Sequence, residues 1–232
     1  MALWDKISSR GNVEDRRSAT SSIALGGGGL GLAGFVIYAL VSLLGGGDAI
    51  DVLNQLPNVQ VQNKQAGSSV LSEADNYPIF ASTVLGSAND MWEKVFAQNN
   101  RTYHAPKLVL FRNATHSGCG ATTSDVGPHY CSVDRTIYLD ETFFQELQTR
   151  FKAKGGDVAE GYVIAHEVGH HVQNELGIMD EVVRKEEMAP GTANQLSINL
   201  ELQADCFAGL WAHSVKQRGV FEVGEVAEAL DA

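Results

Sequence analysis

The spacing of hydrophobic residues predicts a mostly helical fold that includes a small β-sheet. Apolar residues recur at helical intervals over residues 81–99, which predicts an amphipathic helix. Residues 107–112 and 135–140 are rich in β-forming residues and are bounded by turn-forming ones, so we expect a strand in each. Residues 141–153 have the pattern of another helix. The pattern therefore favours an α+β domain.

The start of a further helix is marked by a capping pattern. Asp157 is expected to be the N-cap, and Glu160 follows three residues later, as in a capping box. Gly177 is a plausible end for this helix, because glycine readily adopts the left-handed conformation that follows many helices.

A second long helix shows the same arrangement. It is expected to begin after Thr192, with Gln195 three residues on, and to end near Gly219. A short helix over residues 222–230 closes the chain. We therefore expect a folded domain over residues 78–232.

An uncharged stretch near the N-terminus predicts a membrane anchor. Residues 23–44 carry no charge, and a helix needs about 20 mostly apolar residues to cross a bilayer. Basic residues precede this stretch, and none follows it before Lys64, so the N-terminus is expected in the cytoplasm. A cleaved signal peptide would have a shorter apolar run and an A-x-A-like site, and a glycine-rich linker would lack FVIYALVSLL. The predicted segments are a tail (1–22), the anchor (23–44), a linker (45–77) and the domain (78–232).

Charge and cysteine usage narrow the partners and the compartment. The net charge of -11 argues against nucleic acid, because phosphate binding needs a basic face. Cys119 and Cys131 flank a turn-rich stretch, and a disulfide there is the natural interpretation in an oxidising compartment. Zinc binding by this pair is the alternative, although its spacing matches no short Cys-x-x-Cys motif. Cys206 is left without a partner in this chain.

The segment VIAHEVGHHVQ, residues 163–173, indicates metal chemistry. His166 and His170 are four positions apart, so on a helix both imidazoles lie on one face and can bind one ion. Glu167 then lies beside that ion, where it can take a proton from the attacking water. His171 lies about 140° from His166 around the helix, so we interpret it as a solvated or packing residue. The alternative is a chance match of H-E-x-x-H on a buried helix.

A catalytic zinc ion needs a third protein ligand from elsewhere in the chain, since such sites keep one position open. Glu201 and Asp205, in the segment ELQAD, are also four residues apart on one helix face. We assign Glu201 as the ligand and Asp205 as the acceptor of the free N–H of a ligand histidine. The alternative is a pair of acids on a solvated face, but the neighbouring residues are apolar and would make unpaired charge costly.

Several segments together resemble the bacterial neutral zinc metallopeptidase family. They are AHEVGHHVQNELG, ELQADCFAGLWAH, the loop CG…VGPHYCSVDRTIYLDETFF, and NVEDRR before a glycine-rich stretch. The resemblance runs from Asn12 to about Ala229. It implies a protein of the bacterial inner membrane with one N-terminal anchor and a zincin-like domain of gluzincin type on the periplasmic or extracellular side.

The resemblance also implies a zinc-dependent endopeptidase that acts on peptide or protein substrates. It assigns His166, Glu167 and His170 to the first motif, and Glu201 and Asp205 to the second. Members of this family continue past the position of the last residue to a late cysteine. The resemblance therefore implies a shortened form, in which the partner of Cys206 lies beyond this sequence.

The predicted mechanism leaves two further questions. We expect an extended substrate to pair with the edge of the 135–140 strand. Tyr130, His129 and His213 are candidates for stabilising the oxyanion. One alternative function is an anchored scaffold that binds zinc without turnover, although the intact Glu167 argues against it. Another is a structural envelope domain in which the motif is accidental.

Overall fold

The computed structural model describes residues 2–18, 76–151 and 156–221. These residues, apart from Asn76, belong to one compact unit. The predicted anchor (23–44), nearly all of the predicted linker and the predicted helix over 222–230 lie outside the described residues. Among the residues that are described, no helix combines the length and apolar character needed to span a bilayer.

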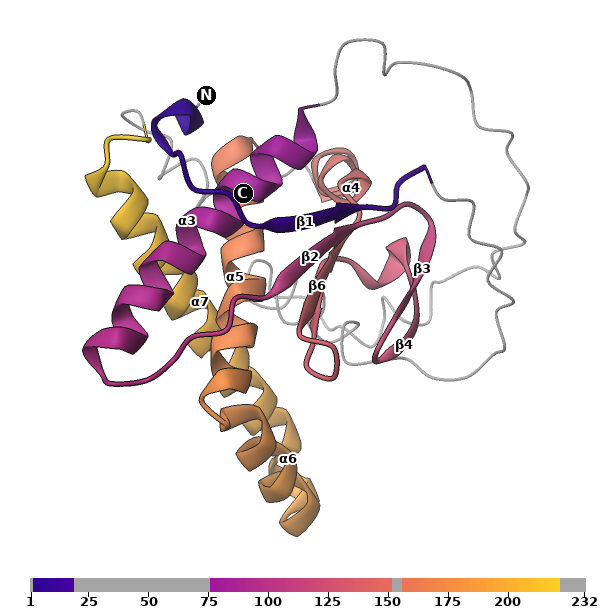
Figure 1. Cartoon of the computed structure of the whole chain (residues 1–232). Coiled ribbons are helices and arrows are strands. Elements are labelled where there is room, and N and C mark those ends of the chain that lie inside the picture. Colours follow the sequence, from indigo (N-terminus) through magenta and orange to yellow (C-terminus); the bar gives the residue numbers. More distant parts are fainter. Residues whose placement is uncertain (1, 19–75, 152–155, 222–232) are drawn as a thin grey trace, which may run out of the picture. The chain divides into compact units, whose positions relative to one another are not determined.

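A four-stranded mixed sheet forms one part of this unit (Figure 1). Its order is β1 (Asn12–Asp15), β2 (Lys107–Leu110), β6 (Thr136–Leu139) and β5 (His129–Cys131). The first three strands are parallel, and β5 runs antiparallel to β6. Because β6 is buried and paired on both sides, the prediction that a substrate adds to the 135–140 strand is wrong. The strands β3 (Ala114–Ser117) and β4 (Gly120–Thr123) form a separate antiparallel pair.

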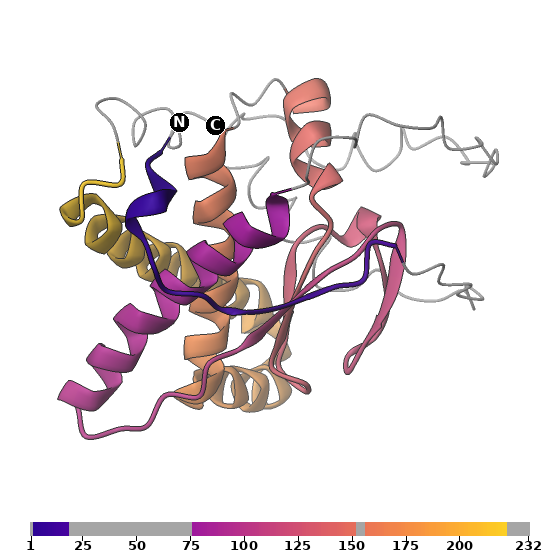
Figure 2. The ribbon, with the colours of Figure 1, turned by 45° about the horizontal axis from the view of Figure 1, so that its top comes forward.

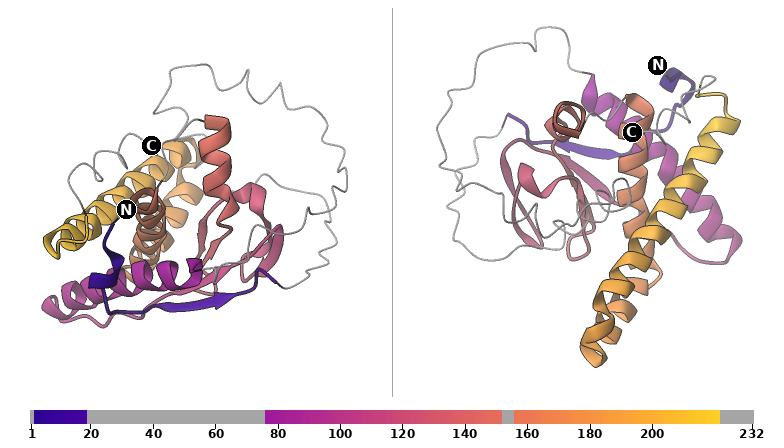
Figure 3. Two further views of the ribbon diagram at one scale, coloured as in Figure 1. Left: turned by 90° about the horizontal axis from the view of Figure 1, so that it is seen from above. Right: turned by 180° about the vertical axis from the view of Figure 1, so that it is seen from behind.

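The helices pack around α5 (Asp157–Glu175), which contacts β5, α3 (Tyr77–Gln98) and α7 (Ala193–Gln217). Figure 3 shows α7 crossing α5, and α6 (Ile178–Met188) lies alongside the first part of α7. The remaining helix, α4, covers Thr142–Phe151. The main core gathers buried residues from the sheet and from α3, α5 and α7, so α5 is held on several sides.

The starts of the two long helices differ from the predicted capping boxes. Asp157 is the first residue of α5, Gly156 occupies the N-cap, and no side chain caps the helix. The Asp157 carboxylate is engaged elsewhere, because Ala2 N–H donates to it. Thr192 does occupy the N-cap of α7, but its hydroxyl donates to the Ala189 carbonyl.

Residues 2–17, which we call the N-terminal arm, are part of the domain. Ala2 and Ile7 lie in the core, Trp4–Lys6 form a short 3-10 helix, and β1 pairs with β2. Figure 2 shows the N-terminal arm passing over α3 before it joins the sheet. The prediction of a separate tail is therefore wrong for these residues. The cause is long-range packing, since β1 is short and charged and gives no strand pattern of its own.

Candidate metal centre

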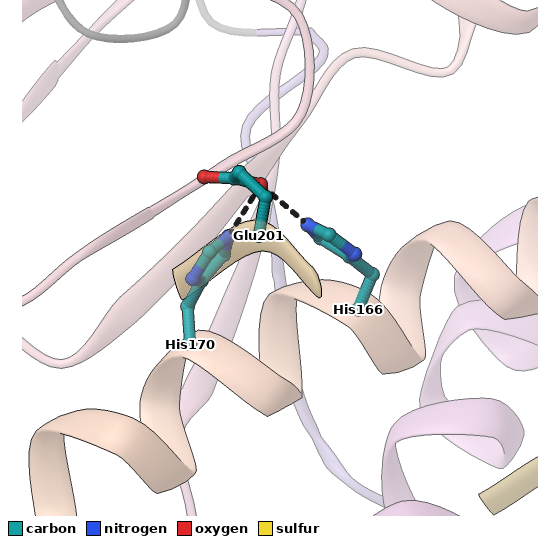
Figure 4. Close-up of side chains that lie close together, drawn as sticks. All are labelled: His166, His170 and Glu201. Carbon is teal, nitrogen blue, oxygen red and sulfur yellow. Dashed lines mark hydrogen bonds and ion pairs between the residues drawn. The ribbon is translucent and has the colours of Figure 1, made fainter. Parts of the chain in front are cut away.

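The two predicted motifs meet where α5 and α7 cross (Figure 4). His166 and His170 project from α5 toward Glu201 of α7. Glu201 Oε2 lies 3.2 Å from His166 Nε2 and 3.4 Å from His170 Nε2. One ligand atom from each of these residues lies within 4.8 Å of the others. The structure thus brings together the three residues that the sequence predicted as metal ligands.

The two nitrogen–oxygen spacings at this site fit a tetrahedral zinc ion. Zinc binds histidine nitrogen and carboxylate oxygen at about 2.0–2.2 Å, so neighbouring ligand atoms in a tetrahedron lie about 3.3 Å apart. The two observed nitrogen–oxygen distances, 3.2 and 3.4 Å, match that edge. Two imidazoles and one carboxylate are also a donor set typical of catalytic zinc, in which the fourth position stays open.

The Nδ1 atom of each ligand histidine forms a hydrogen bond with a different side chain. His166 Nδ1 donates to Asp205 Oδ1 at 2.8 Å, as predicted for Asp205. His170 Nδ1 lies 2.9 Å from Gln173 Oε1, a contact that the sequence analysis missed. Gln173 is three residues from His170 and so shares its helix face, which was the one available signal. Both contacts leave the Nε2 atoms directed at Glu201.

The electrostatics of the site favour positive charge. Burial alone would lower the pKa of His166, but hydrogen bonds to Asp205 and Glu201 outweigh it and raise the pKa to about 10. The pKa of His170 is also raised, because its contact with Glu201 and the charge of Glu167 outweigh burial. Burial opposes ionisation of Glu201, yet its two histidine partners lower its pKa to about 2. The carboxylates that stabilise the protonated histidines would also attract a divalent cation.

Glu167 is placed to act as a base. It is only 5% exposed, and its charge acts on both ligand histidines. Within the described part of the chain, no hydrogen bond or ion pair involves its carboxylate. A buried carboxylate that no protein donor occupies remains available to accept a proton beside the metal.

The remaining histidine of the motif lies away from the site. His171 is fully buried, and its Nε2 donates to the His104 carbonyl at 2.6 Å. Its Nδ1 accepts from Tyr130 Oη at 3.0 Å, and Asn174 also donates to that hydroxyl. Burial lowers the pKa of His171, consistent with a neutral ring. His171 is thus a packing residue rather than a solvated one.

The three oxyanion candidates have other partners. The Tyr130 hydroxyl forms hydrogen bonds with His171 and Asn174, neither of which is a predicted ligand. His129 stacks on Tyr138 and contacts the Gly127 carbonyl. His213 pairs with Gln217 near the end of α7. Among the described residues, none of the three forms a hydrogen bond with a ligand residue.

The cysteines behave as predicted. Cys119 and Cys131 form a disulfide, which excludes the alternative of zinc binding by this pair. Cys206 is free and exposed on α7.

Comparison with known proteins identifies the class of this chain. The chain belongs to the family described as "Putative neutral zinc metallopeptidase", whose family model matches residues 2–232. It is 41% identical over 233 residues to Uncharacterized protein YpfJ of Escherichia coli strain K12, covering 99% of this chain and 81% of that protein. It is also 49% identical over 118 residues to Uncharacterized protein Rv2575 of Mycobacterium tuberculosis strain H37Rv. This match covers 50% of this chain and 39% of Rv2575. No solved structure matches it, so the gluzincin-type assignment stays a prediction.

Proposed function

We propose that this protein is a zinc-dependent endopeptidase. The observation that carries this proposal is the pairing of a three-ligand cluster with a buried, uncommitted carboxylate on the same helix. His166, His170 and Glu201 would hold zinc, and the two nitrogen–oxygen spacings fit that ion. Membership of a family described as a zinc metallopeptidase supports the same chemistry.

The residues of the chain divide the work of peptide hydrolysis. When bound, zinc would polarise the scissile carbonyl and lower the pKa of water at its open position. Glu167 takes a proton from the attacking water and later gives it to the leaving amine. Asp205 keeps His166 Nδ1 protonated, so that Nε2 is directed to the metal.

The peptide would lie along β5 (His129–Cys131) rather than along β6. β5 is an edge strand of the sheet, and it contacts the metal-bearing helix α5. An extended peptide can add to a free edge through main-chain hydrogen bonds. This placement keeps the predicted mode of substrate binding but moves it to the last strand of the described sheet.

The test is a comparison of two glutamate variants on α5. The full chain, loaded with one equivalent of zinc, should cleave a casein-like substrate, and a chelator should abolish the cleavage. Glu167→Gln should retain zinc and lose about 10²–10⁴-fold in rate, which is the usual contribution of a general base. Glu160→Gln, at the start of the same helix, is the matched control and should remain active.

Two results would overturn the proposal. A wild-type chain that holds one zinc but cleaves no peptide would be a zinc-binding scaffold instead. Cleavage that continues unchanged in Glu167→Gln would show that the activity comes from another group or from a contaminant.

A further inference from the structure

A buried amide connects the two helices that supply the metal ligands. Gln173 is fully buried on α5. Its Oε1 lies 2.9 Å from His170 Nδ1. Its Nε2 donates to the Leu200 carbonyl at 2.7 Å and to Gln203 Oε1 at 3.1 Å. Leu200 directly precedes the ligand Glu201, so one side chain contacts the surroundings of two ligands.

The chemistry of these contacts fixes the orientation of the amide. The Leu200 carbonyl can only accept a hydrogen bond, so the NH₂ group of Gln173 must face it. Oε1 must then face His170, and His170 Nδ1 must carry the proton that it accepts. His170 Nε2 is thereby left to bind the metal. At a fully buried position, no solvent can replace these bonds.

We propose that Gln173 is a positioning residue that sets the tautomer of His170 and the position of Glu201 for zinc binding. This role rests on the metal site and not on peptidase activity. A merely structural role would also make Gln173 important for folding, but it would leave the affinity for zinc unchanged in any variant that folds.

The test measures zinc affinity by competition with a chromogenic chelator. Gln173→Leu should bind zinc about 10–100-fold more weakly than wild type, as is typical when the hydrogen-bond partner of a metal ligand is lost. Gln173→Glu keeps an acceptor for His170 but loses the donor to the Leu200 carbonyl, so its affinity should lie between those of wild type and Gln173→Leu. Gln203→Leu removes only the outer contact of the amide, serves as the matched control, and should stay within about threefold of wild type.

Wild-type affinity in Gln173→Leu would overturn the proposal, as would equal loss in the leucine and glutamate variants. If Gln173→Leu does not fold, the wild-type chain decides by NMR. The His170 Nδ1 proton should then be protected from exchange and show a through-space contact with the side chain of Gln173. The absence of that proton would overturn the proposal.

A second, independent observation concerns the N-terminal arm. Ala2 N–H and Trp4 Nε1–H both donate to Asp157 Oδ2, at 2.8 and 2.9 Å. The Trp4 ring stacks on Trp211 of α7 with centroids 6.3 Å apart. The N-terminal arm therefore ties the first residue of the metal-bearing helix to α7.

Close backbone contacts hold the rest of the N-terminal arm. A Cβ atom on Gly86 of α3 would lie 2.6 Å from the Arg10 backbone nitrogen, and one on Gly11 would lie 2.5 Å from Leu85. Gly11 and Ser82 exchange two hydrogen bonds. Four residues of β1 then pair with β2 in parallel, from Asn12 with Lys107 onward. Such a fit requires the N-terminal arm and the domain to fold in the same compartment.

The geometry points to a membrane topology different from that expected of a single anchor. We infer that residues 2–17, 77–151 and 156–221 lie on one side of any membrane that the protein contacts. A single crossing between residues 17 and 77 would place β1 and β2 on opposite sides, which their pairing forbids. This inference replaces the predicted arrangement of a cytoplasmic N-terminus and an external domain.

The test uses full-length protein in its native membranes or cytosol. In a Cys206→Ser background, Asn12→Cys with Lys107→Cys should form an intramolecular disulfide on mild oxidation, whereas either single variant should not. Independently, a membrane-impermeant maleimide should label exposed Cys206 and a Ser8→Cys variant from the same side. Labelling from opposite sides, or failure of the double variant to cross-link while it folds, would overturn the inference.

Discussion

Gly169 of α5 lies against the backbone of Ala204 of α7, so closely that a Cβ atom on Gly169 would be 3.0 Å from both Cα and the carbonyl oxygen of Ala204. The absence of a side chain at Gly169 lets the two helices approach at the point where their ligands face each other. His170 follows Gly169 directly, and Glu201 lies one turn before Asp205. This crossing therefore sets the distance between the imidazoles and the carboxylate.

Gly169→Val should push α7 away from α5. The added atoms would meet backbone, which cannot move aside as a flexible side chain can, and overpacking of this kind costs about 1–3 kcal/mol. Zinc affinity should fall together with the free energy of unfolding, measured by urea titration. Gly209→Ala, at an exposed position of α7, is the control, since no heavy atom lies within 4 Å of the point that its Cβ would occupy. This variant should gain up to about 1 kcal/mol in stability from helix propensity. A valine variant that binds zinc as wild type does would contradict this account.

Asp205→Ala should weaken zinc binding without abolishing it. Removing the acceptor of His166 Nδ1–H frees the ring to rotate and lowers its basicity, and such losses typically reduce metal affinity about 10–100-fold. Competition with a chelator measures the change at constant pH. Asp180→Ala, on α6 and outside the site, should leave the affinity unchanged. Equal affinities for the two variants would show that Asp205 does not support the ligand.

Glu160 should make stability depend on pH. Burial raises its pKa to about 7, with the charges of Asp157 and Glu141 adding to burial and a hydrogen bond with Tyr77 opposing it. Because the folded pKa lies above the usual value of 4.5, this group stabilises the fold below about pH 4.5, and that contribution is lost as pH rises to about 7. The free energy of unfolding of Glu160→Gln, minus that of wild type, should therefore increase from pH 4.5 to 7. A difference that is constant or decreases over this range would contradict the prediction.

Loss of the disulfide should destabilise the protein without removing the metal site. Cys119 and Cys131 are separated by 12 residues, and a loop of this size restricts the unfolded chain by about 3 kcal/mol in the chain-entropy estimate. Cys119→Ser with Cys131→Ser should lower the free energy of unfolding by about that amount, while zinc stoichiometry stays at one. Cys206→Ser serves as the control, because that residue is free and exposed. No change in stability would mean that the unfolded state gains nothing from the cross-link's removal.

The metal ligands could be predicted because helical geometry is local. Residues four apart share a face of any α-helix, so His166 with His170 and Glu201 with Asp205 each formed a recognisable pair before their partners were known. Because a catalytic zinc ion needs a third protein ligand, we expected the two pairs to meet, and the structure confirms this expectation. The role of Gln173 could not be predicted, because the sequence does not indicate whether an uncharged amide on a helix is buried.

The sheet was predictable only in part, since strand order depends on contacts between distant residues. The strands within 107–112 and 135–140 have clear β-forming patterns, but nothing in them shows that β6 is central and β5 lies at the edge. The charged sequence of β1 was interpreted as part of a tail because a long apolar stretch follows it. Its pairing with β2 is a tertiary effect that local periodicity does not contain.

The contact of Ala2 with Asp157 joins residues that are 155 positions apart. During synthesis, the N-terminal arm leaves the ribosome first, yet its binding site exists only after α5 and α7 have been made. Long-range closure of this kind slows folding, because chain entropy is lost before any contact compensates for it. The N-terminal arm, although synthesised first, is therefore expected to dock only after α7 has left the ribosome.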